Sequence, residues 1–407
     1  MYIVFCNIIQ KLKTDLFVYI LVFSLIIISD DCYWFSTSGN HLLFNIKLIF
    51  TFFLPVLLYY KGARLSEKQF IFIFFAGLLL SLSSLISYSS LGGVSILLCI
   101  ILSSLLLTRK YEFYFLSSIY SHVIMIIMIY SLVLWVLLSF SLIEPTMLEN
   151  KAEAIIQSYG GCIFFEGSFG GVRNSAIFRE PGMFMIFICL GYYFDVFIRQ
   201  RILSKYQILL YFLSMASTFS TAGFIVFSIL YVLSIFNKSF KGKRLILPLF
   251  LLLGAIIICF SSEVIYNNVF GKLNSSSSEV GSSLSRVSSI FVPLNIMFDN
   301  LFLGVGTGPF RDVYIDKAYS LYHTFLDPAG EGTNTFFNAG ALFGVWLFFL
   351  IIFGFYKFSS KSSAKLVIKF GLFLCLLLIF SNESMVYSIL PYILVFYGYD
   401  NKKILIN

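Results

Sequence analysis

The stretch at residues 61–110, KGARLSEKQFIFIFFAGLLLSLSSLISYSSLGGVSILLCIILSSLLLTRK, contains the pattern that decides the fold. Two apolar runs, at 69–87 and 94–108, are separated by a gap without any charged residue, and their other ends meet basic gaps that include Lys68 and Arg109. Apolar runs of this kind predict helices that cross a membrane, because lipid offers backbone N–H and C=O groups no partner and only a helix satisfies them internally. The same alternation of basic gaps with gaps poor in Lys and Arg continues along the chain.

Composition extends this pattern to the whole chain of 407 residues, of which 59% are hydrophobic and only 12% are charged. A water-soluble chain of this length would usually form two or three domains, and this composition excludes that arrangement. We predict one all-α polytopic membrane domain over residues 1–407, with about 12 transmembrane helices and an uncleaved first span. The predicted spans cover residues 15–29, 42–60, 69–87, 94–108, 116–139, 182–198, 206–219, 222–236, 245–260, 334–356, 366–380 and 385–399.

The orientation of the spans follows from where the 28 Lys and Arg residues fall. Most of them lie in alternate gaps, and most of the acidic residues lie in the other gaps. The positive-inside rule places the basic gaps in the cytoplasm, so we predict a multi-pass membrane protein with both termini cytoplasmic. The net charge of +8 is spread over helix ends, which favours membrane lipids as partners and argues against nucleic acid.

The seven cysteines show no CxxC or Cys/His spacing, so we expect no metal site and no cofactor. Cys32 and Cys162 fall in gaps assigned to the outside, where a disulfide between them is an open alternative.

Two of the gaps assigned to the outside are long, at 142–181 and 261–333, and long connections are usually functional or disordered. In the second, apolar residues at helical spacing between Ile290 and Leu301 predict an amphipathic helix kinked at Pro293. This helix either lies on the outer leaflet or is buried within the loop.

The first long gap ends in Arg173-Asn-Ser-Ala-Ile-Phe-Arg179-Glu180-Pro181-Gly182. Pro181 suits the first position of a helix, and Glu180 before it suits the positive end of the helix dipole. A helix N-terminus beside two guanidinium groups predicts a site for a phosphate or pyrophosphate. The alternative is a plain helix start whose arginines bind lipid headgroups.

The second long gap contributes Arg286, Arg311 and His323, the only histidine in either long gap. Histidine changes charge near neutral pH, which makes His323 a candidate general base. The alternative is a solvated loop histidine. The glycines between Gly304 and Gly308 either form a backbone nest for an anion or are a simple exit from a helix.

Two histidines, His122 within the fifth predicted span and His41 at the outer end of the second, are interpreted as structural, and Asp195 sits near the inner end of its span. The centres of the predicted spans lack the paired acids or basic ladder that a proton- or ion-coupled transporter requires.

Four motifs together resemble the Wzy-type O-antigen polymerases, over residues 173–344. The stretch 173–182 resembles their R…F.EPG signature, and Ser220-Thr-Ala-Gly223 resembles their turn between two spans. Arg286 with the stretch 299–306 resembles their R…(D)NPLFGVG loop. The stretch 332–337 with later glycines resembles their HN.(F/Y)L…G..G entry to a late span. Asn334 departs from this pattern, because many relatives and the related O-antigen ligases carry histidine there.

The resemblance implies polymerisation of undecaprenyl-pyrophosphate-linked oligosaccharide repeat units into O-antigen or capsule-type polysaccharide, on the periplasmic face of the bacterial inner membrane. Stabilising the charge that develops on the pyrophosphate is then the main chemical demand. The candidates for binding it are Arg173, Arg179 and Arg286, and the candidate bases are His323 and Glu180. Asn334 and Arg311 are further candidates for binding substrate. A chain-length regulator protein is a further implied partner.

Two other functions stay open at this point. An O-antigen ligase would use the same donor and transfer the glycan to lipid A core. A flippase for the lipid-linked oligosaccharide would be a transporter of similar span number, but it would be expected to have short outer loops and charges within its cavity.

Overall fold

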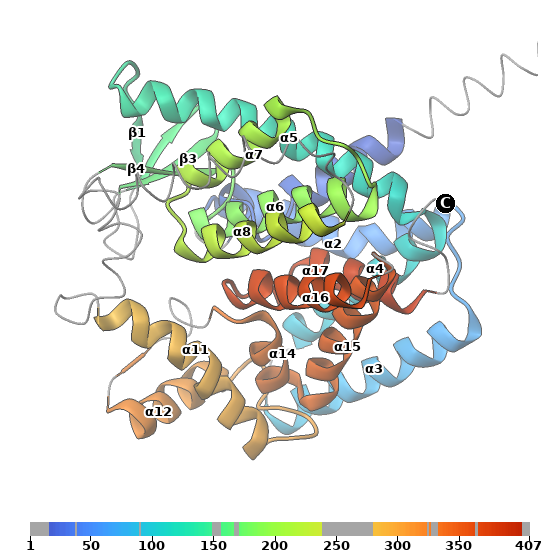
Figure 1. The fold of residues 1–407 in the computed structure, drawn as a ribbon. Coiled ribbons are helices and arrows are strands. Elements are labelled where there is room, and N and C mark those ends of the chain that lie inside the picture. Colours follow the sequence, from blue (N-terminus) through green and yellow to red (C-terminus); the bar gives the residue numbers. More distant parts are fainter. Residues whose placement is uncertain are drawn as a thin grey trace, which may run out of the picture.

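A computed structural model describes residues 16–36, 39–88, 91–148, 156–166, 171–237, 280–323, 325–326, 333–362 and 365–400, and for 280–286 only the backbone. The predicted span 245–260 and the basic residues near both ends of the chain lie outside this part. The described part is mostly helical, and five of its helices are long and apolar enough to cross a membrane. Shorter apolar helices accompany them, so the coarse prediction of a membrane-embedded helical protein agrees with the fold (Figure 1).

The helices follow the apolar runs of the sequence closely, because each run ends at polar residues that begin or end a helix. Ser66 and Ser204, for example, each form a capping box with the glutamine three residues later. The helices of these runs are Leu16–Ile27, α2 (His41–Tyr60), α3 (Glu67–Ile86), α4 (Leu91–Lys110), α5 (Phe113–Ser139), α6 (Pro181–Tyr193) with its π-helical continuation η2 (Phe194–Ile198), α7 (Lys205–Ser217), α8 (Thr221–Phe236), α16 (Leu366–Ser381) and α17 (Ile389–Tyr399). A tight turn separates α7 from α8, with Ser220 capping α8 through a hydrogen bond from the Gly223 amide, as the sequence predicts.

The predicted span 334–356 is wrong as one helix. It consists of α14 (Thr335–Phe343) and α15 (Val345–Lys361), which are separated at Gly344 with φ +96°. The reason is that the loop after Asp299 crosses the chain here. A Cβ atom on Gly344 would collide with the carbonyl oxygen of Phe302, and the Val345 amide donates to the Leu301 carbonyl at 2.8 Å.

The glycines of the stretch 304–306 make close contacts from the side of the crossing loop. The crossing of this loop with the break at Gly344 is here called the interlock. Gly304 has φ +65°, and a Cβ atom there would collide with Leu342. The Gly304 amide donates to the Asn300 carbonyl at 2.9 Å, and the Gly306 amide donates to the Leu342 carbonyl at 2.9 Å. These amides are therefore used within the fold, which favours the helix exit over the anion nest.

The expectation of an all-α chain is wrong in the first long loop. Four strands, β1 (Thr146–Leu148), β2 (Ile156–Tyr159), β3 (Cys162–Glu166) and β4 (Val172–Ala176), form an antiparallel sheet in the order β1-β2-β3-β4. The turn between β2 and β3 is Gly160-Gly161, with φ +57° and +81°. Two consecutive residues with positive φ are the requirement of a tight hairpin turn, which explains the pair of glycines.

The sheet is fixed to the helices by buried apolar residues and by hydrogen bonds. Cys162 and Phe164 of β3 pack against Leu134 and Leu138 of α5. Asn174 of β4 donates to the Ser217 hydroxyl at the end of α7, at 3.1 Å. Cys162 and Cys32 are both buried, free cysteines in the structure.

The two helices of the second long loop, α11 (Val280–Asp299) and α12 (Phe310–Tyr322), lie at the same end of the bundle as the sheet, here called the sheet end (Figure 1). Val292 and Ile296 of α11 are fully buried against Tyr314 of α12 and Ala341 of α14. Of the two alternatives for the amphipathic helix, the structure therefore favours the one packed within the loop, and Pro293 lies inside α11.

We expect Gly344→Ala to destabilise the protein more than a matched glycine substitution. Alanine at Gly344 meets both an unfavourable backbone conformation and the Phe302 carbonyl, which together should cost about 3 kcal/mol or more. Gly171 has φ +87°, and a Cβ atom at that position would have no other atom within 4 Å, so Gly171→Ala should cost only about 1–2 kcal/mol. Thermal unfolding in detergent measures both, and equal losses would contradict the interlock.

Candidate active site

A cavity of about 400 Å³ lies at the sheet end, where five segments far apart in the sequence converge. Its wall includes Asp31 after the first helix, Arg179 and Glu180 at the start of α6, Arg311 at the start of α12, and Glu383 between α16 and α17. Three of the residues predicted from the sequence, Arg179, Glu180 and Arg311, are therefore brought together. Asp31 and Glu383 join them without having been predicted as site residues.

The start of α6 positions Arg179 and Glu180. Glu180 is the N-cap residue and Pro181 begins the helix, as the sequence predicts. The backbone amide of Arg179 donates to the Asp31 carbonyl at 3.0 Å, which joins this segment to the loop after the first helix. The guanidinium of Arg179 donates through Nη2 to the Ser384 carbonyl at 3.1 Å, and its Nε has no hydrogen-bond partner in the described structure.

Glu383 is a buried carboxyl group beside this helix start, with 7% of its surface exposed. Its Oε2 lies 3.6 Å from Nη2 of Arg179, and its side chain is hydrogen bonded to that of Glu180. Burial raises the pKa of Glu383 well above its ordinary value, the nearby Glu180 raises it further, and Arg179 opposes both effects. Glu180 and Glu383 are therefore a carboxyl pair that can share one proton.

Gly182 provides the space that Glu383 occupies. A Cβ atom at this position would lie 2.5 Å from Oε1 of Glu383, so any other residue would push the carboxyl group away from the helix start. Each residue of the stretch Arg179-Glu-Pro-Gly182 thus has its own physical role. Arg179 forms the ion pair, Glu180 is the carboxyl partner of Glu383, Pro181 begins the helix and Gly182 leaves room for Glu383.

Thr335, the first residue of α14, holds the loop that carries Glu383. Its hydroxyl donates to the Glu383 carbonyl at 2.6 Å and accepts from the Met385 amide at 3.0 Å. Asn334 before it is fully buried and caps α14, with Oδ1 accepting from the Phe337 amide at 3.1 Å. The position where many Wzy-type polymerases carry histidine is therefore a helix cap directly beside the cavity, and the Nδ2 of Asn334 has no hydrogen-bond partner in the described structure.

Asp31 is a second buried carboxyl group of the cavity, with 2% of its surface exposed. Its Oδ2 accepts a hydrogen bond of 2.6 Å from the Ser388 hydroxyl. Burial raises the pKa of Asp31 from 3.8 to about 6, against the lowering effect of Ser388 and Arg179.

The net charge of the cavity depends on whether Glu383 and Asp31 are protonated. Arg179 and Arg311 supply two positive charges, and Glu180, Glu383, Asp31 and Asp30 supply four negative charges when all are ionised, of which that of Asp30 is balanced by its ion pair with Lys47. With Glu383 and Asp31 protonated, only Glu180 opposes the two arginines. Proton uptake thus changes the cavity from one that repels an anion to one that attracts it.

A second, mainly apolar cavity of about 380 Å³ adjoins the first and shares Asp30, Thr307, Tyr387 and Ser388 with it. The first helix, α2 and α4 form its apolar wall. Lys47 of α2 lies at its polar end, where Nζ is 2.7 Å from Oδ1 of Asp30 and neutralises that carboxylate.

The described structure does not bring Arg173 or His323 into this wall. Nε of Arg173 donates to the Thr218 carbonyl at 3.2 Å, which ties β4 to the turn between α7 and α8. His323 ends α12 with φ +53° and lies twelve residues beyond Arg311, which is about 18 Å along a helix. Arg286 lies in α11, and its side chain is outside the described structure.

Comparisons with protein-family models, with curated proteins and with solved structures find no match to this chain. The resemblance to the Wzy-type polymerases stays a prediction that rests on the motifs themselves.

The raised pKa of Asp31 predicts how stability depends on pH. The folded state holds this proton up to about pH 6 and the unfolded state only to about pH 3.8, so stability falls as pH rises between these values and stays lower above pH 6. Asp31→Asn cannot ionise and therefore does not lose stability in this way. Its thermal midpoint should be higher than that of the wild type at pH 7.5, and the difference should be smaller at pH 4.5. The gain should be at most about 3 kcal/mol.

Asp30→Asn is the matched control for this experiment. It leaves Lys47 without its carboxylate partner and should therefore lower the thermal midpoint at both pH values. A midpoint difference for Asp31→Asn that does not change with pH would contradict the assignment.

Proposed function

We propose that this chain is a membrane glycosyltransferase that polymerises undecaprenyl-pyrophosphate-linked oligosaccharide repeat units on the periplasmic face of the bacterial inner membrane. The observation that carries the proposal is the polar cavity, in which the Glu180–Glu383 pair and two arginines face one space beside an apolar cavity. The motif at 173–182 supports it, because Arg179 and Glu180 line that cavity, while Pro181 begins the helix and Gly182 leaves room for Glu383.

The proposal includes the twelve spans and the orientation that the charge pattern predicts. In that orientation the sheet end faces the periplasm, because both long loops lie there. A donor that carries its sugars on a membrane-anchored pyrophosphate would present them at this surface. The adjoining apolar cavity between the first helix, α2 and α4 suits the first units of the lipid chain.

The reaction requires a base for the acceptor hydroxyl and positive charge for the departing pyrophosphate, and the cavity supplies residues for both. The acceptor hydroxyl oxygen forms a bond to the anomeric carbon of the donor while the bond from that carbon to the pyrophosphate oxygen breaks. The hydroxyl proton passes to the carboxylate of Glu180, with Glu383 as its hydrogen-bonded partner. Arg179 and Arg311 stabilise the charge on the departing pyrophosphate.

The geometry of the cavity favours one of the two candidate bases. The sequence offers His323 and Glu180 as alternatives, and the geometry favours Glu180 because it lies in the wall of the cavity with Arg179.

Glu180→Gln and Glu383→Gln should each abolish the ladder of long glycans and leave surface glycan with a single repeat unit. A general base contributes about 10²–10⁴-fold to the rate, which is enough to remove long chains. His323→Ala is the matched control and should keep the ladder. Gel electrophoresis of surface glycan from cells with equal amounts of each protein gives the readout.

Two outcomes would decide against this proposal. Full ladders from both glutamine variants would exclude the carboxyl pair as the base. Loss of all surface glycan, with polymer accumulating on the lipid carrier, would indicate a ligase that transfers to lipid A core.

Arg179→Lys tests the anion site separately from the base. Lysine keeps the charge but cannot form the forked hydrogen bonds that suit a phosphate, so the ladder should shorten or disappear. Arg173→Lys is the control, because Arg173 binds a backbone carbonyl outside the cavity, and it should keep a normal ladder. A normal ladder from Arg179→Lys would leave no role for a guanidinium fork there.

A further inference from the structure

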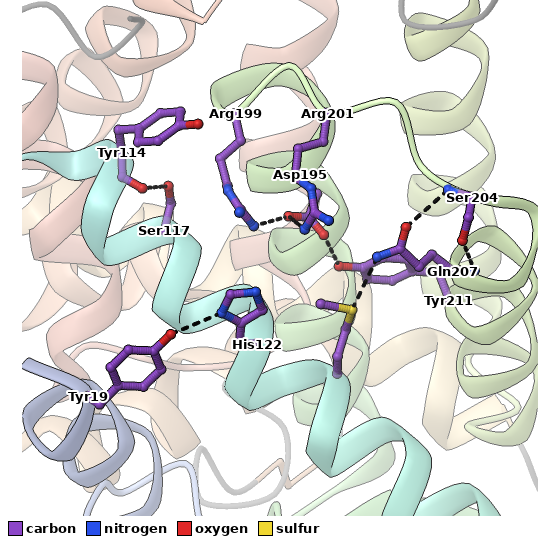
Figure 2. A network of polar contacts seen from close by, with 11 residues as sticks. Tyr19, Tyr114, Ser117, His122, Asp195, Arg199, Arg201, Ser204, Gln207 and Tyr211 are labelled. Atoms are coloured by element: carbon purple, nitrogen blue, oxygen red, sulfur yellow. Dashed lines mark hydrogen bonds and ion pairs between the residues drawn. The ribbon is translucent and has the colours of Figure 1, made fainter. Parts of the chain in front are cut away.

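A second charged cluster lies at the opposite end of α6 from the cavity. Asp195 of η2 is fully buried, and its Oδ1 accepts a hydrogen bond of 2.7 Å from Nη1 of Arg199. Its Oδ2 accepts a hydrogen bond of 3.0 Å from the Tyr211 hydroxyl. Figure 2 shows Arg199 and Arg201 both directed toward this carboxylate from the turn that follows η2.

The cluster holds more positive charge than its carboxylate neutralises. Both oxygens of Asp195 are already engaged, and Nη1 of Arg201 lies 3.9 Å from Oδ1, which is too far for a hydrogen bond. Nε of Arg199 and Nη1 of Arg201 are buried and have no hydrogen-bond partner in the described structure, so a ligand would reach the cluster at the exposed part of the Arg201 guanidinium. Two guanidinium groups against one carboxylate leave a net charge of +1.

Two exposed apolar side chains lie near Arg201 in the chain, as they would on a surface in contact with lipid. The Arg201 side chain is 36% exposed. Ile202 beside it and Tyr206 of α7 are 55% and 70% exposed. His122 of α5 lies between Tyr19 and the Arg199–Asp195 pair, and the Tyr19 hydroxyl is 3.3 Å from Nδ1 of His122 (Figure 2).

We propose that this cluster, Asp195 with Arg199, Arg201 and the nearby His122, binds the phosphate group of an anionic membrane lipid. A guanidinium with free N–H groups binds phosphate oxygens through two parallel hydrogen bonds. The net charge of +1 favours an anionic headgroup over a zwitterionic one. Basic pockets between membrane helices on the cytoplasmic side, where the charge pattern places this end of α6, have this composition.

The apolar surface decides between a lipid and a free phosphate ion. A free ion would satisfy the guanidinium groups, but it would leave Ile202 and Tyr206 exposed. A lipid satisfies the same groups through its headgroup and covers the apolar side chains with its acyl chains. The site is independent of the proposed glycosyltransferase function, because it lies at the other end of α6.

Binding of dioleoyl phosphatidylglycerol to the delipidated protein in neutral detergent, followed by native mass spectrometry, tests the proposal. Wild type should bind this lipid more tightly than dioleoyl phosphatidylcholine, and Arg201→Gln should weaken binding about fivefold. Lys205→Gln removes an exposed charge at the same end and should bind as the wild type does. Arg201→Lys, which keeps the charge and loses the fork, is a second variant should Arg201→Gln fail to fold, and it too should bind more weakly than the wild type.

Three results would overturn the proposal. The first is equal binding by Arg201→Gln (or by Arg201→Lys, should the glutamine variant not fold) and the wild type. The second is equal loss in Lys205→Gln and Arg201→Gln, which would indicate general surface attraction. The third is full competition by inorganic phosphate at the concentration of the lipid, which would indicate a site for a free anion.

Discussion

The contact on which the candidate site depends is that of the Glu383 carboxyl group with the start of α6. A carboxyl group this buried is stable only where a cation and hydrogen-bonding groups surround it. Arg179, Glu180 and the space at Gly182 provide that environment. Thr335 holds the loop in place from behind. One buried side chain thus joins the first long loop, α14 and the C-terminal helices into a single wall.

The sequence predicts one side of this contact and not the other. Apolar runs identify the helices because lipid requires both an apolar surface and a satisfied backbone, and both demands are visible in composition. Pro181 marks the helix start, and the arginines around it stand out among gaps that are poor in basic residues. Glu383 shows no comparable signal, because it lies in a short gap some 200 residues later and no local pattern tells which helix end a loop acid will meet. Arg173 and His323 illustrate the converse, since residue type and spacing single them out while the fold turns them to other partners.

The two errors in the fold share a physical cause. The strands of the first loop are three to five residues long, and their buried face depends on α5 rather than on an alternation within each strand. Only the Gly160-Gly161 turn indicates them in the sequence. The break at Gly344 likewise depends on a loop about 40 residues earlier that crosses the chain there. Both features follow from contacts between distant segments, which periodicity cannot reveal.

α6 and η2 form the most buried of the long apolar helices, and each end meets a buried ionisable group. At the start, carboxyl groups outnumber guanidinium groups, and burial raises the pKa of Glu383, so that a proton reduces the excess negative charge. At the far end, guanidinium groups outnumber the single carboxylate of Asp195. Arginine does not lose its proton in a protein, so protonation chemistry cannot reduce an excess of positive charge there. Inside a membrane protein, an excess of carboxylates can thus be neutralised by taking up protons, whereas an excess of arginines is neutralised by an anion from outside the chain.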